Sequence, residues 1–305
     1  MNTRFLLRFA VAIAVAIAVA TCSTQEQSAT EQQVLDLSYG LAEAKTVAVD
    51  GTVLTYIARG AGSPVLLVHG QLSDFRFWKE LIEEGSDRHL FIAYSRRYFF
   101  PNPSSQSLPR FQEPTDVTDL IGFIEALNVS PVHLVGHSSG GHAALLAAIK
   151  RPDLVRSLVL AEGGFLAVPG VENAGIAASR AARALLEAGE DEQAVRSFID
   201  ATSGPGTFDR KTEIDRRANL DNRMALGLPI SPPPSCAEVG SITMPTMIVR
   251  GDSSPAFLNT LMKALSACLP GAEQVIIPHS SHEMFLDNAE AFNGAVLRFI
   301  DDNDL

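Results

Sequence analysis

Short runs of apolar residues recur along most of the chain, separated by longer segments that repeat apolar residues at helical spacing. Asp50-Gly51, between the first two runs, is a two-residue hairpin signal. The later runs are apolar throughout, which is typical of strands buried on both faces of a parallel sheet. The pattern therefore predicts an α/β fold, with a mostly parallel sheet of eight strands and helices on both faces. The strands are expected at Thr46–Val49, Val53–Ile57, Val65–Val68, Leu90–Ala93, Val132–Val135, Leu158–Ala161, Thr246–Val249 and Gln274–Ile277, and the main helices near Phe75–Glu84, Thr115–Leu127, Gly140–Lys150, up to Cys268, and at Ala289–Ile300.

The alternation stops between residues 163 and 235. Arg180–Ala188 and Glu192–Asp200 have helical patterns, and Pro232-Pro233-Pro234 closes the segment without a clear strand. We interpret 163–235 as a helical lid insertion in a core formed by 41–162 and 236–305. Its place after a strand puts it at the carboxyl edge of the sheet, where a lid would cover a pocket. A packed subdomain with no moving part is the alternative.

The first forty residues follow a different pattern. Two arginines precede an unbroken apolar run at Phe9–Ala20, which is shorter than the ~20 residues of a transmembrane helix. Residues 1–21 are therefore interpreted as a signal peptide, and the polar stretch 22–40 as a tether. A signal peptide implies export. Two processing routes are alternatives: cleavage after Ala20 would give a secreted protein, and lipidation of Cys22 would give an envelope lipoprotein attached to the membrane.

Composition narrows the range of partners. The formal net charge is −11, with 46% hydrophobic and 19% charged residues, which is an ordinary globular composition. An acidic chain without a basic block is repelled by phosphate backbones, so nucleic-acid binding is not expected. The expected partner is a small-molecule substrate, and the oligomeric state stays open.

Two cysteines remain once Cys22 is set aside. Cys236 lies shortly before the expected strand at Thr246–Val249, and Cys268 ends the helix that follows it. Because a crossover helix runs antiparallel to its strand, both sulfurs should lie near the same end of that strand. One disulfide and two separate buried thiols both fit this placement.

Polar residues follow three of the expected strands directly. These sequences are His69-Gly70-Gln71, Gly136-His137-Ser138-Ser139-Gly140 and Pro278-His279-Ser280-Ser281-His282. A GxSxG turn exposes its serine at a strained bend, and the flanking glycines let strand and helix approach each other. A serine hydroxyl attacks only with a histidine in hydrogen-bond reach, which in turn needs an orienting carboxylate.

With these motifs in this order, residues 41–305 resemble the α/β-hydrolase superfamily in nearly all parts except the lid insertion. The resemblance implies Ser138 as nucleophile and His282 as general base. It also implies an oxyanion hole formed by the backbone N–H groups of Gln71 and Ser139. No cofactor is implied, and no metal-ligand spacing occurs in the chain.

The acid of the triad departs from the family pattern. After the seventh strand, relatives usually carry GxxD, whereas this chain has Gly251-Asp252-Ser253-Ser254. Glu162, directly after the sixth strand, is the candidate that we favour, and Asp252 is the close alternative. A water-assisted pair of serine and histidine is a more distant third.

Other polar residues flank the expected pocket. His69 and His137 adjoin the strand ends, where packing is the simpler interpretation of both. Arg96, in an unusual Ser-Arg-Arg-Tyr-Phe-Phe segment, is a weak candidate for holding a substrate carboxylate. The alternative is that the arginines of this segment pair with surface acids.

Together these features predict an exported serine hydrolase that acts on carboxylic esters through an acyl-enzyme. Lactonase, thioesterase, amidase and carbon–carbon bond hydrolase chemistry use the same nucleophile and remain alternatives. A hypothesis of another class is a catalytically inactive homologue that binds ligands or envelope partners, which the missing GxxD aspartate motivates.

Overall fold

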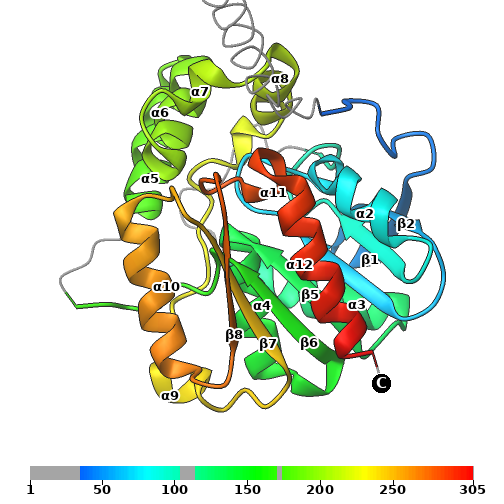
Figure 1. Cartoon of the computed structure of the whole chain (residues 1–305). Coiled ribbons are helices and arrows are strands. Elements are labelled where there is room, and N and C mark those ends of the chain that lie inside the picture. The colour runs from blue at the N-terminus through cyan, green and yellow to red at the C-terminus, as the bar shows by residue number, and fades with distance from the viewer. Residues whose placement is uncertain (1–34, 104–113, 170–173, 305) are drawn as a thin grey trace, which may run out of the picture. The chain divides into compact units, whose positions relative to one another are not determined.

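The centre of the fold is an eight-stranded sheet in the order β1-β2-β4-β3-β5-β6-β7-β8 (Figure 1). The computed structural model describes residues 35–103, 114–169 and 174–304. β2 pairs antiparallel with β1 and β4, and all other neighbours pair parallel, so the predicted mostly parallel sheet is confirmed. The strands are β1 (Lys45–Val49), β2 (Thr52–Arg59), β3 (Pro64–Val68), β4 (Leu90–Tyr94), β5 (Val132–His137), β6 (Val155–Ala161), β7 (Thr246–Gly251) and β8 (Glu273–Ile277).

Helices cover both faces of this sheet, because successive residues of the buried strands point to opposite sides. In β3, Leu66 and Val68 belong to the core under α3, α4 and α10, while Val65 and Leu67 belong to the core under α2 and α12. Figure 1 shows α12 and α2 together on the near face. The core helices are η1 (Phe75–Trp78), α2 (Lys79–Gly85), α3 (Asp116–Leu127), α4 (Ser138–Lys150), η2 (Pro152–Leu154), α9 (Cys236–Val239), α10 (Ala256–Cys268), α11 (Met284–Asp287) and α12 (Ala289–Asp302).

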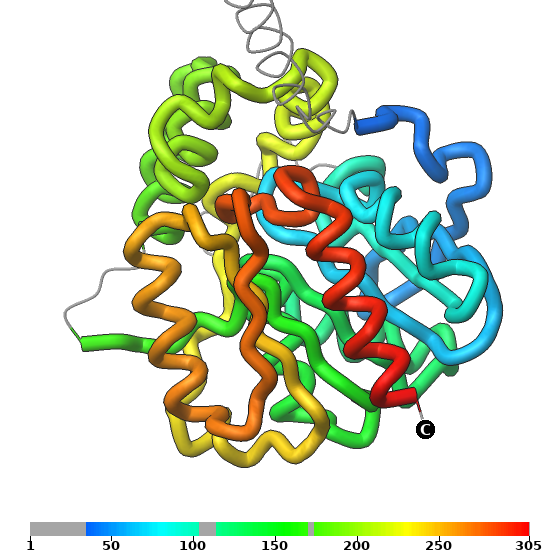
Figure 2. Tube along the Cα trace, in the orientation of Figure 1, coloured from blue at the N-terminus to red at the C-terminus, as the bar shows by residue number. Residues whose placement is uncertain are grey.

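The insertion between β6 and β7 is helical, as its sequence pattern predicts. Its first two helices pack around a small apolar cluster that includes Ala182, Val195 and Phe198 and that Leu72, in the loop after β3, also joins. In Figure 1 and Figure 2 the helices of this segment, green to yellow, lie at the top, beyond the ends of the strands. Its elements are α5 (Ala174–Glu187), α6 (Asp191–Ser203), α7 (Thr207–Arg210), α8 (Glu213–Asp221) and η3 (Arg223–Ala225).

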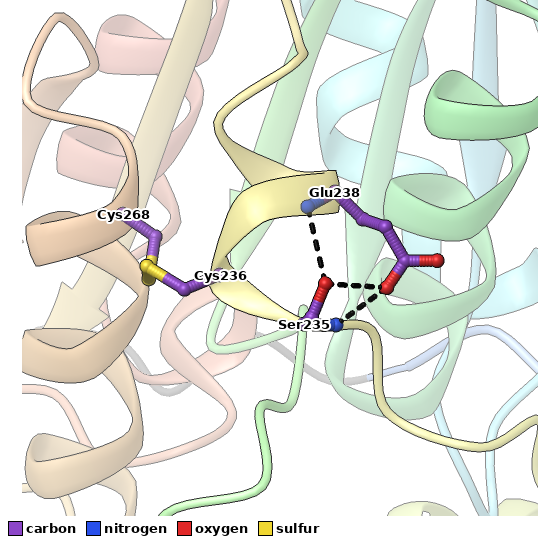
Figure 3. Close-up of a disulfide and its surroundings, with 4 residues drawn as sticks. All are labelled: Ser235, Cys236, Glu238 and Cys268. Atoms are coloured by element: carbon purple, nitrogen blue, oxygen red, sulfur yellow. Dashed lines mark hydrogen bonds between the residues drawn. A yellow bond between two sulfur atoms is a disulfide. The ribbon is translucent and has the colours of Figure 1, made fainter.

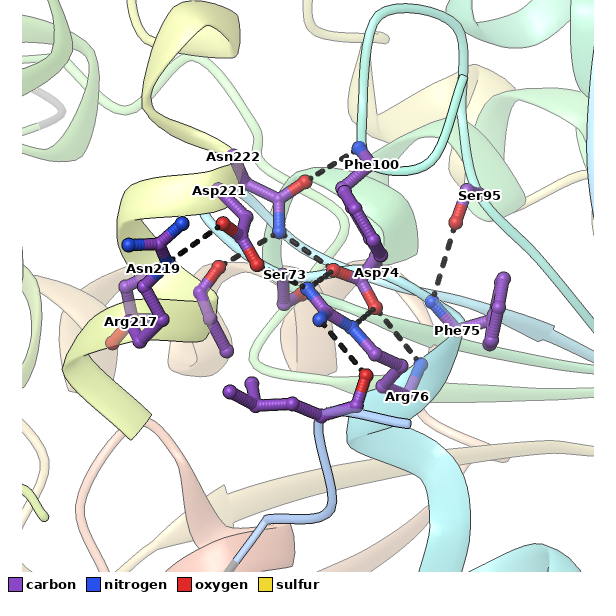
Figure 4. Close-up of polar contacts among 12 residues, drawn as sticks. Ser73, Asp74, Phe75, Arg76, Ser95, Phe100, Arg217, Asn219, Asp221 and Asn222 are labelled. Carbon is purple, nitrogen blue, oxygen red and sulfur yellow. Dashed lines mark hydrogen bonds and ion pairs between the residues drawn. The ribbon is translucent and has the colours of Figure 1, made fainter. Parts of the chain in front are cut away.

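A buried polar network fastens the α8 end of the insertion to the loop after β3 (Figure 4). The Arg76 guanidinium donates to both carboxylate oxygens of Asp74, at 2.9 and 2.7 Å, and these side chains are 1% and 0% exposed. Arg76 also reaches Asp221 at 3.2 Å, and the Asn222 amide donates to Asp74 at 2.7 Å. Burying a charged pair is tolerated when its remaining lone pairs and protons are satisfied, which Asp221 and Asn222 achieve here.

A disulfide between Cys236 and Cys268 joins α9 to the end of α10, with the two Cα atoms 5.2 Å apart (Figure 3). α9 is only four residues long and begins with a capping box. The Ser235 hydroxyl accepts from the Glu238 N–H, and the Ser235 N–H donates back to the Glu238 carboxylate. The chain therefore re-enters the core at a short helix that is covalently held.

The expected polar tether ends earlier than the sequence analysis places it. Leu35 and Tyr39 are 6% and 4% exposed and pack into the core beneath α2, because apolar residues at this spacing find a hydrophobic surface there. The predicted signal peptide 1–21 and Cys22 lie outside the described residues. Within the described ranges, no helix combines the length and the apolarity needed to cross a membrane.

Candidate active site

Ser138 lies at the bend between β5 and α4. Its φ is 52°, in the left-handed region that costs a non-glycine residue about 1–3 kcal/mol. The bend is tight because a Cβ on Gly136 would lie 2.6 Å from the Gly141 Cα, and one on Gly140 would lie 2.2 Å from the His69 carbonyl oxygen. The glycines therefore permit the close approach of strand, helix and the β3 loop that leaves Ser138 at the surface of a cavity.

His282, in the loop between β8 and α11, joins Ser138 to a carboxylate. Its Nε2 lies 2.9 Å from the Ser138 Oγ, and its Nδ1 lies 2.6 Å from Glu162 Oε2. Glu162 follows β6 directly and is fully buried, and its second oxygen accepts the Gly251 N–H at 3.0 Å. Both oxygens of the carboxylate are thus engaged, which orients it toward the imidazole.

Asp252, the alternative acid, makes other contacts. Its carboxylate accepts the N–H groups of His279 at 2.9 Å and Ser280 at 3.1 Å, and the Ser253 hydroxyl at 2.8 Å. These donors, the His279 N–H first, hold the pKa of Asp252 below its usual value. The structure therefore brings Glu162 to His282 and uses Asp252 to shape the loop that precedes the histidine.

His137 supports His282 from behind. Its ring centroid lies 4.6 Å from that of His282, and its Nε2 donates to the His282 carbonyl at 2.8 Å. Burial, and next the neighbouring His282, hold the pKa of His137 well below its usual value. His137 is therefore neutral and places no positive charge beside the imidazole.

A cavity of about 630 Å³ opens beside Ser138 and His282. Its walls are mainly apolar and come from 165–169, 227–233 and α10, together with residues of α5 and α6. Gln71 and Ser139, the expected oxyanion-hole residues, both line it. Ser139 is the second residue of α4, where N–H groups have no acceptor within the helix. The Gln71 N–H donates to no acceptor within the described residues.

Three residues that the sequence analysis places weakly at the pocket do not line this cavity. His69, His137 and Arg96 are 1%, 5% and 8% exposed and lie behind the Ser138 bend, because the loops after β3 and β4 fold inward there. Arg96 lines a separate hollow of about 30 Å³. It pairs with the Ser139 hydroxyl and the His69 carbonyl rather than with a surface acid.

Sequence reasoning misses several residues of the cavity wall. His142 of α4 accepts the Phe165 N–H at Nδ1, at 3.2 Å, and donates from Nε2 to the Ser231 carbonyl, at 2.8 Å. Arg180 reaches the cavity from α5. His142 lies one turn after Ser138 on α4, so its helical spacing could have indicated it. Arg180 belongs to no motif, and only the position of the insertion over the sheet edge brings it to the cavity. Within the described ranges, no three His, Cys, Asp or Glu side chains are grouped to hold a metal ion.

Comparison with known proteins gives relatives across most of the chain. Serine hydrolase BPHL of Mus musculus is 25% identical over 265 residues, covering 83% of this chain and 85% of that protein. The 2-(acetamidomethylene)succinate hydrolase of Mesorhizobium japonicum is 28% identical over 258 residues, covering 80% and 90%. The solved structure of a thermophilic esterase from Thermogutta terrifontis shares the fold, with a TM-score of 0.69 at 22% identity, covering 86% of this chain and 98% of that one.

A family model described as "Alpha/beta hydrolase family" matches residues 65–295, from β3 into α12. The matched range includes the bend at Ser138, Glu162, the insertion and His282. The protein therefore belongs to the alpha/beta hydrolase family, and it is a hydrolase.

Proposed function

We propose that the protein hydrolyses carboxylic esters through an acyl-enzyme on Ser138. The observation that carries this proposal is the continuous chain of contacts from Ser138 Oγ to His282 Nε2, at 2.9 Å, and from His282 Nδ1 to Glu162 Oε2, at 2.6 Å. These are the distances over which a histidine can accept a serine proton while a carboxylate stabilises the imidazolium that forms.

In the first half of the reaction, Ser138 Oγ attacks the ester carbonyl and its proton passes to His282 Nε2. The developing negative charge on the carbonyl oxygen is stabilised by the N–H groups of Gln71 and Ser139. Because Glu162 is fully buried, its charge acts on the imidazolium with little screening by water. His282 then donates the proton to the leaving alkoxide, and the acyl group stays on Ser138.

In the second half, His282 takes a proton from a water molecule that attacks the acyl-enzyme. Collapse of the second tetrahedral intermediate expels Ser138 Oγ, which recovers its proton from His282, and releases the carboxylic acid. The neutral state of His137 fits this cycle, since a cation stacked on His282 would disfavour each formation of imidazolium.

The residues that line the cavity indicate which substituents the ester substrate carries. Most of its lining is apolar, and it includes no Asp or Glu among the described residues, while Arg180 contributes a positive charge. Apolar walls favour hydrocarbon groups, and the missing carboxylate disfavours a cationic substituent. The proposal therefore covers neutral or anionic esters with an apolar acyl or alcohol group.

A fluorophosphonate probe tests the proposed nucleophile. We expect it to label the folded wild type and to fail on Ser138→Ala. A folded wild type that resists labelling would instead support the inactive, ligand-binding alternative.

A substrate panel tests the bond class. It comprises p-nitrophenyl esters of increasing acyl length, a lactone and a thioester, assayed on the wild type and on Ser138→Ala. We expect Ser138-dependent turnover to be highest on an ester. Higher turnover on the lactone or the thioester would reassign the bond that is broken and leave the nucleophile in place.

A further inference from the structure

Arg96 lies directly behind the residues that would form the oxyanion hole. It follows β4 and is 8% exposed. From this position its Nη1 donates to the Ser139 Oγ at 2.9 Å and to the His69 carbonyl at 3.3 Å. One guanidinium thus joins the first turn of α4 to the loop after β3, the two segments that carry the Ser139 and Gln71 N–H groups.

The backbone of Arg96 determines how His69 hydrogen-bonds. The Arg96 N–H donates to His69 Nε2 at 2.9 Å, so this nitrogen is the acceptor and Nδ1 carries the proton. Nδ1 then donates to the Gly70 carbonyl at 2.8 Å. Burial, and next the charge of Arg96, hold the pKa of His69 well below its usual value, which favours the neutral ring. The Arg96 N–H at Nε2 determines which tautomer this neutral ring adopts.

The Gly70 carbonyl and the Gln71 N–H belong to the same peptide unit. In a trans peptide the C=O and N–H bonds are nearly antiparallel, so holding the carbonyl in one direction aims the N–H in the other. The Gly70 carbonyl is held by His69 Nδ1, with the Ser73 hydroxyl at 3.4 Å as a second donor. The orientation of the Gln71 N–H therefore depends on His69, and the orientation of His69 depends on Arg96.

Arg96 differs from its neighbour Arg97 in how its charge is used. Arg97 pairs with the Asp119 carboxylate at 2.6 Å, whereas no ion pair joins Arg96 to a carboxylate of the described residues. Burying an unpaired cation opposes folding. Since Arg96 also does not line the cavity with Ser138, its contacts lead to the backbone around the site rather than to a substrate.

We propose that Arg96 is a positioning residue for both N–H donors of the oxyanion hole. Its guanidinium holds Ser139 through the hydroxyl and the Gln71 segment through the His69 carbonyl, and its backbone N–H orients the His69 ring. The inference rests on the acyl-enzyme mechanism proposed above. Oxyanion stabilisation depends on donors placed about 2.7–3.1 Å from the oxygen of the tetrahedral intermediate. A small displacement of either segment therefore weakens the transition state more than it weakens substrate binding.

The test compares Arg96→Met with Arg97→Met, two substitutions that each remove one guanidinium from the same loop. Arg96→Met keeps the backbone N–H that bonds to His69 Nε2, so it tests the contacts of the guanidinium with Ser139 and the His69 carbonyl. We expect Arg96→Met to lower kcat for a p-nitrophenyl ester about 10- to 100-fold with KM changed less than about threefold. Arg97→Met should leave kcat within about twofold even if it lowers the melting temperature, because it touches neither segment. Circular dichroism checks that both variants are folded.

A trifluoromethyl ketone supplies the readout that a purely structural role would not move. This inhibitor forms a tetrahedral oxyanion adduct on a serine, so Arg96→Met should weaken its binding by the same factor as kcat. Binding of the carboxylic acid product should not change. Equal losses of kcat in the two variants, or an unchanged kcat in folded Arg96→Met, would overturn the positioning role.

Ser139→Ala provides a second route if Arg96→Met does not fold. It removes the acceptor of the guanidinium and keeps the Ser139 N–H, so we expect kcat to fall about three- to tenfold at constant KM. An unchanged kcat in Ser139→Ala would also overturn the inference. Failure of the proposed function would be seen separately, as a wild type with no Ser138-dependent turnover of any ester.

Discussion

At the floor of the cavity, polar side chains are held by short hydrogen bonds, whereas the roof formed by α5 and α6 rests mainly on apolar contacts. His282 is fixed from both ring nitrogens and from its own carbonyl. The roof packs around a separate cluster that includes Ala182 and Phe198. Directional contacts define one geometry, while apolar packing tolerates changes of shape and volume. We propose from this difference that the floor determines the reaction and the roof selects the substrate.

The largest effect is expected when the carboxylate charge of Glu162, at the floor of the cavity, is removed. Glu162→Gln keeps the size of the side chain and removes the charge that would stabilise the imidazolium of His282. We expect kcat for a p-nitrophenyl ester to fall about 10³- to 10⁴-fold, measured under saturating substrate. Asp252→Asn is the matched control and should stay within a few-fold of wild type. The reverse ranking of the two variants would move the acid to Asp252.

The next effect concerns the buried polar network that attaches the α8 end of the insertion to the loop after β3. Arg76→Met leaves the buried Asp74 carboxylate without its partner, and we expect the free energy of unfolding to fall by about 3–5 kcal/mol in urea titrations. Arg217 contacts the same Asp221 as Arg76 does, at 3.3 Å, but is 70% exposed. Arg217→Met should therefore change stability little. Similar losses in both variants would mean that burial does not distinguish these pairs.

A smaller effect is expected at the roof. Arg180→Gln should lower kcat/KM about fivefold for an ester that ends in a carboxylate, because it removes one partly solvated ion pair. A neutral ester of the same length should change less than twofold. Arg183, also on α5, pairs with Glu187 at 3.1 Å, and Arg183→Gln serves as the control. Equal losses on both esters would remove Arg180 from substrate selection.

The smallest effect is a pH dependence at Asp252. The folded-state pKa of this carboxyl is lowered, chiefly by the His279 N–H, so its contribution to stability is present above the unfolded-state pKa of about 3.9 and is lost as the pH falls through the folded value. The difference in melting temperature between wild type and Asp252→Asn should therefore shrink from about pH 6 toward about pH 3. A difference that stays constant over this range would contradict the assignment.

The residues at the floor of the cavity could be predicted from the sequence more completely than the elements of the insertion. The elbow and the strand ends have local signatures, because tight turns require glycine and buried parallel strands require apolar runs. α8 has no comparable signature, since most of its residues are polar. Asp221 and Asn222, at its end, hold it to Arg76 and Asp74, which lie 145 and 148 residues away in sequence. Local patterns carry no information about such distant partners.

The same limit explains what could be predicted of the site. Ser138 and His282 could be named because their motifs are local and their order along the chain is informative. The sequence favours Glu162 as the acid but leaves Asp252 as a close alternative, because both residues follow strands that are neighbours in the sheet. The structure separates them because Asp252 is occupied by the N–H groups of His279 and Ser280, while Glu162 is turned toward His282.

By itself, the sequence determined the apolar strands of the sheet, the bend at Ser138 and the helical character of α5 and α6, since each of these elements is specified by residues that are close together in the chain. Only the tertiary structure decided which carboxylate meets His282, which residues enclose the cavity and which charge lies behind the Ser139 and Gln71 N–H groups. Those contacts join segments separated by tens of residues or more. They form because the β6, β7 and β8 ends and the insertion converge at one edge of the sheet, a convergence that no local pattern encodes.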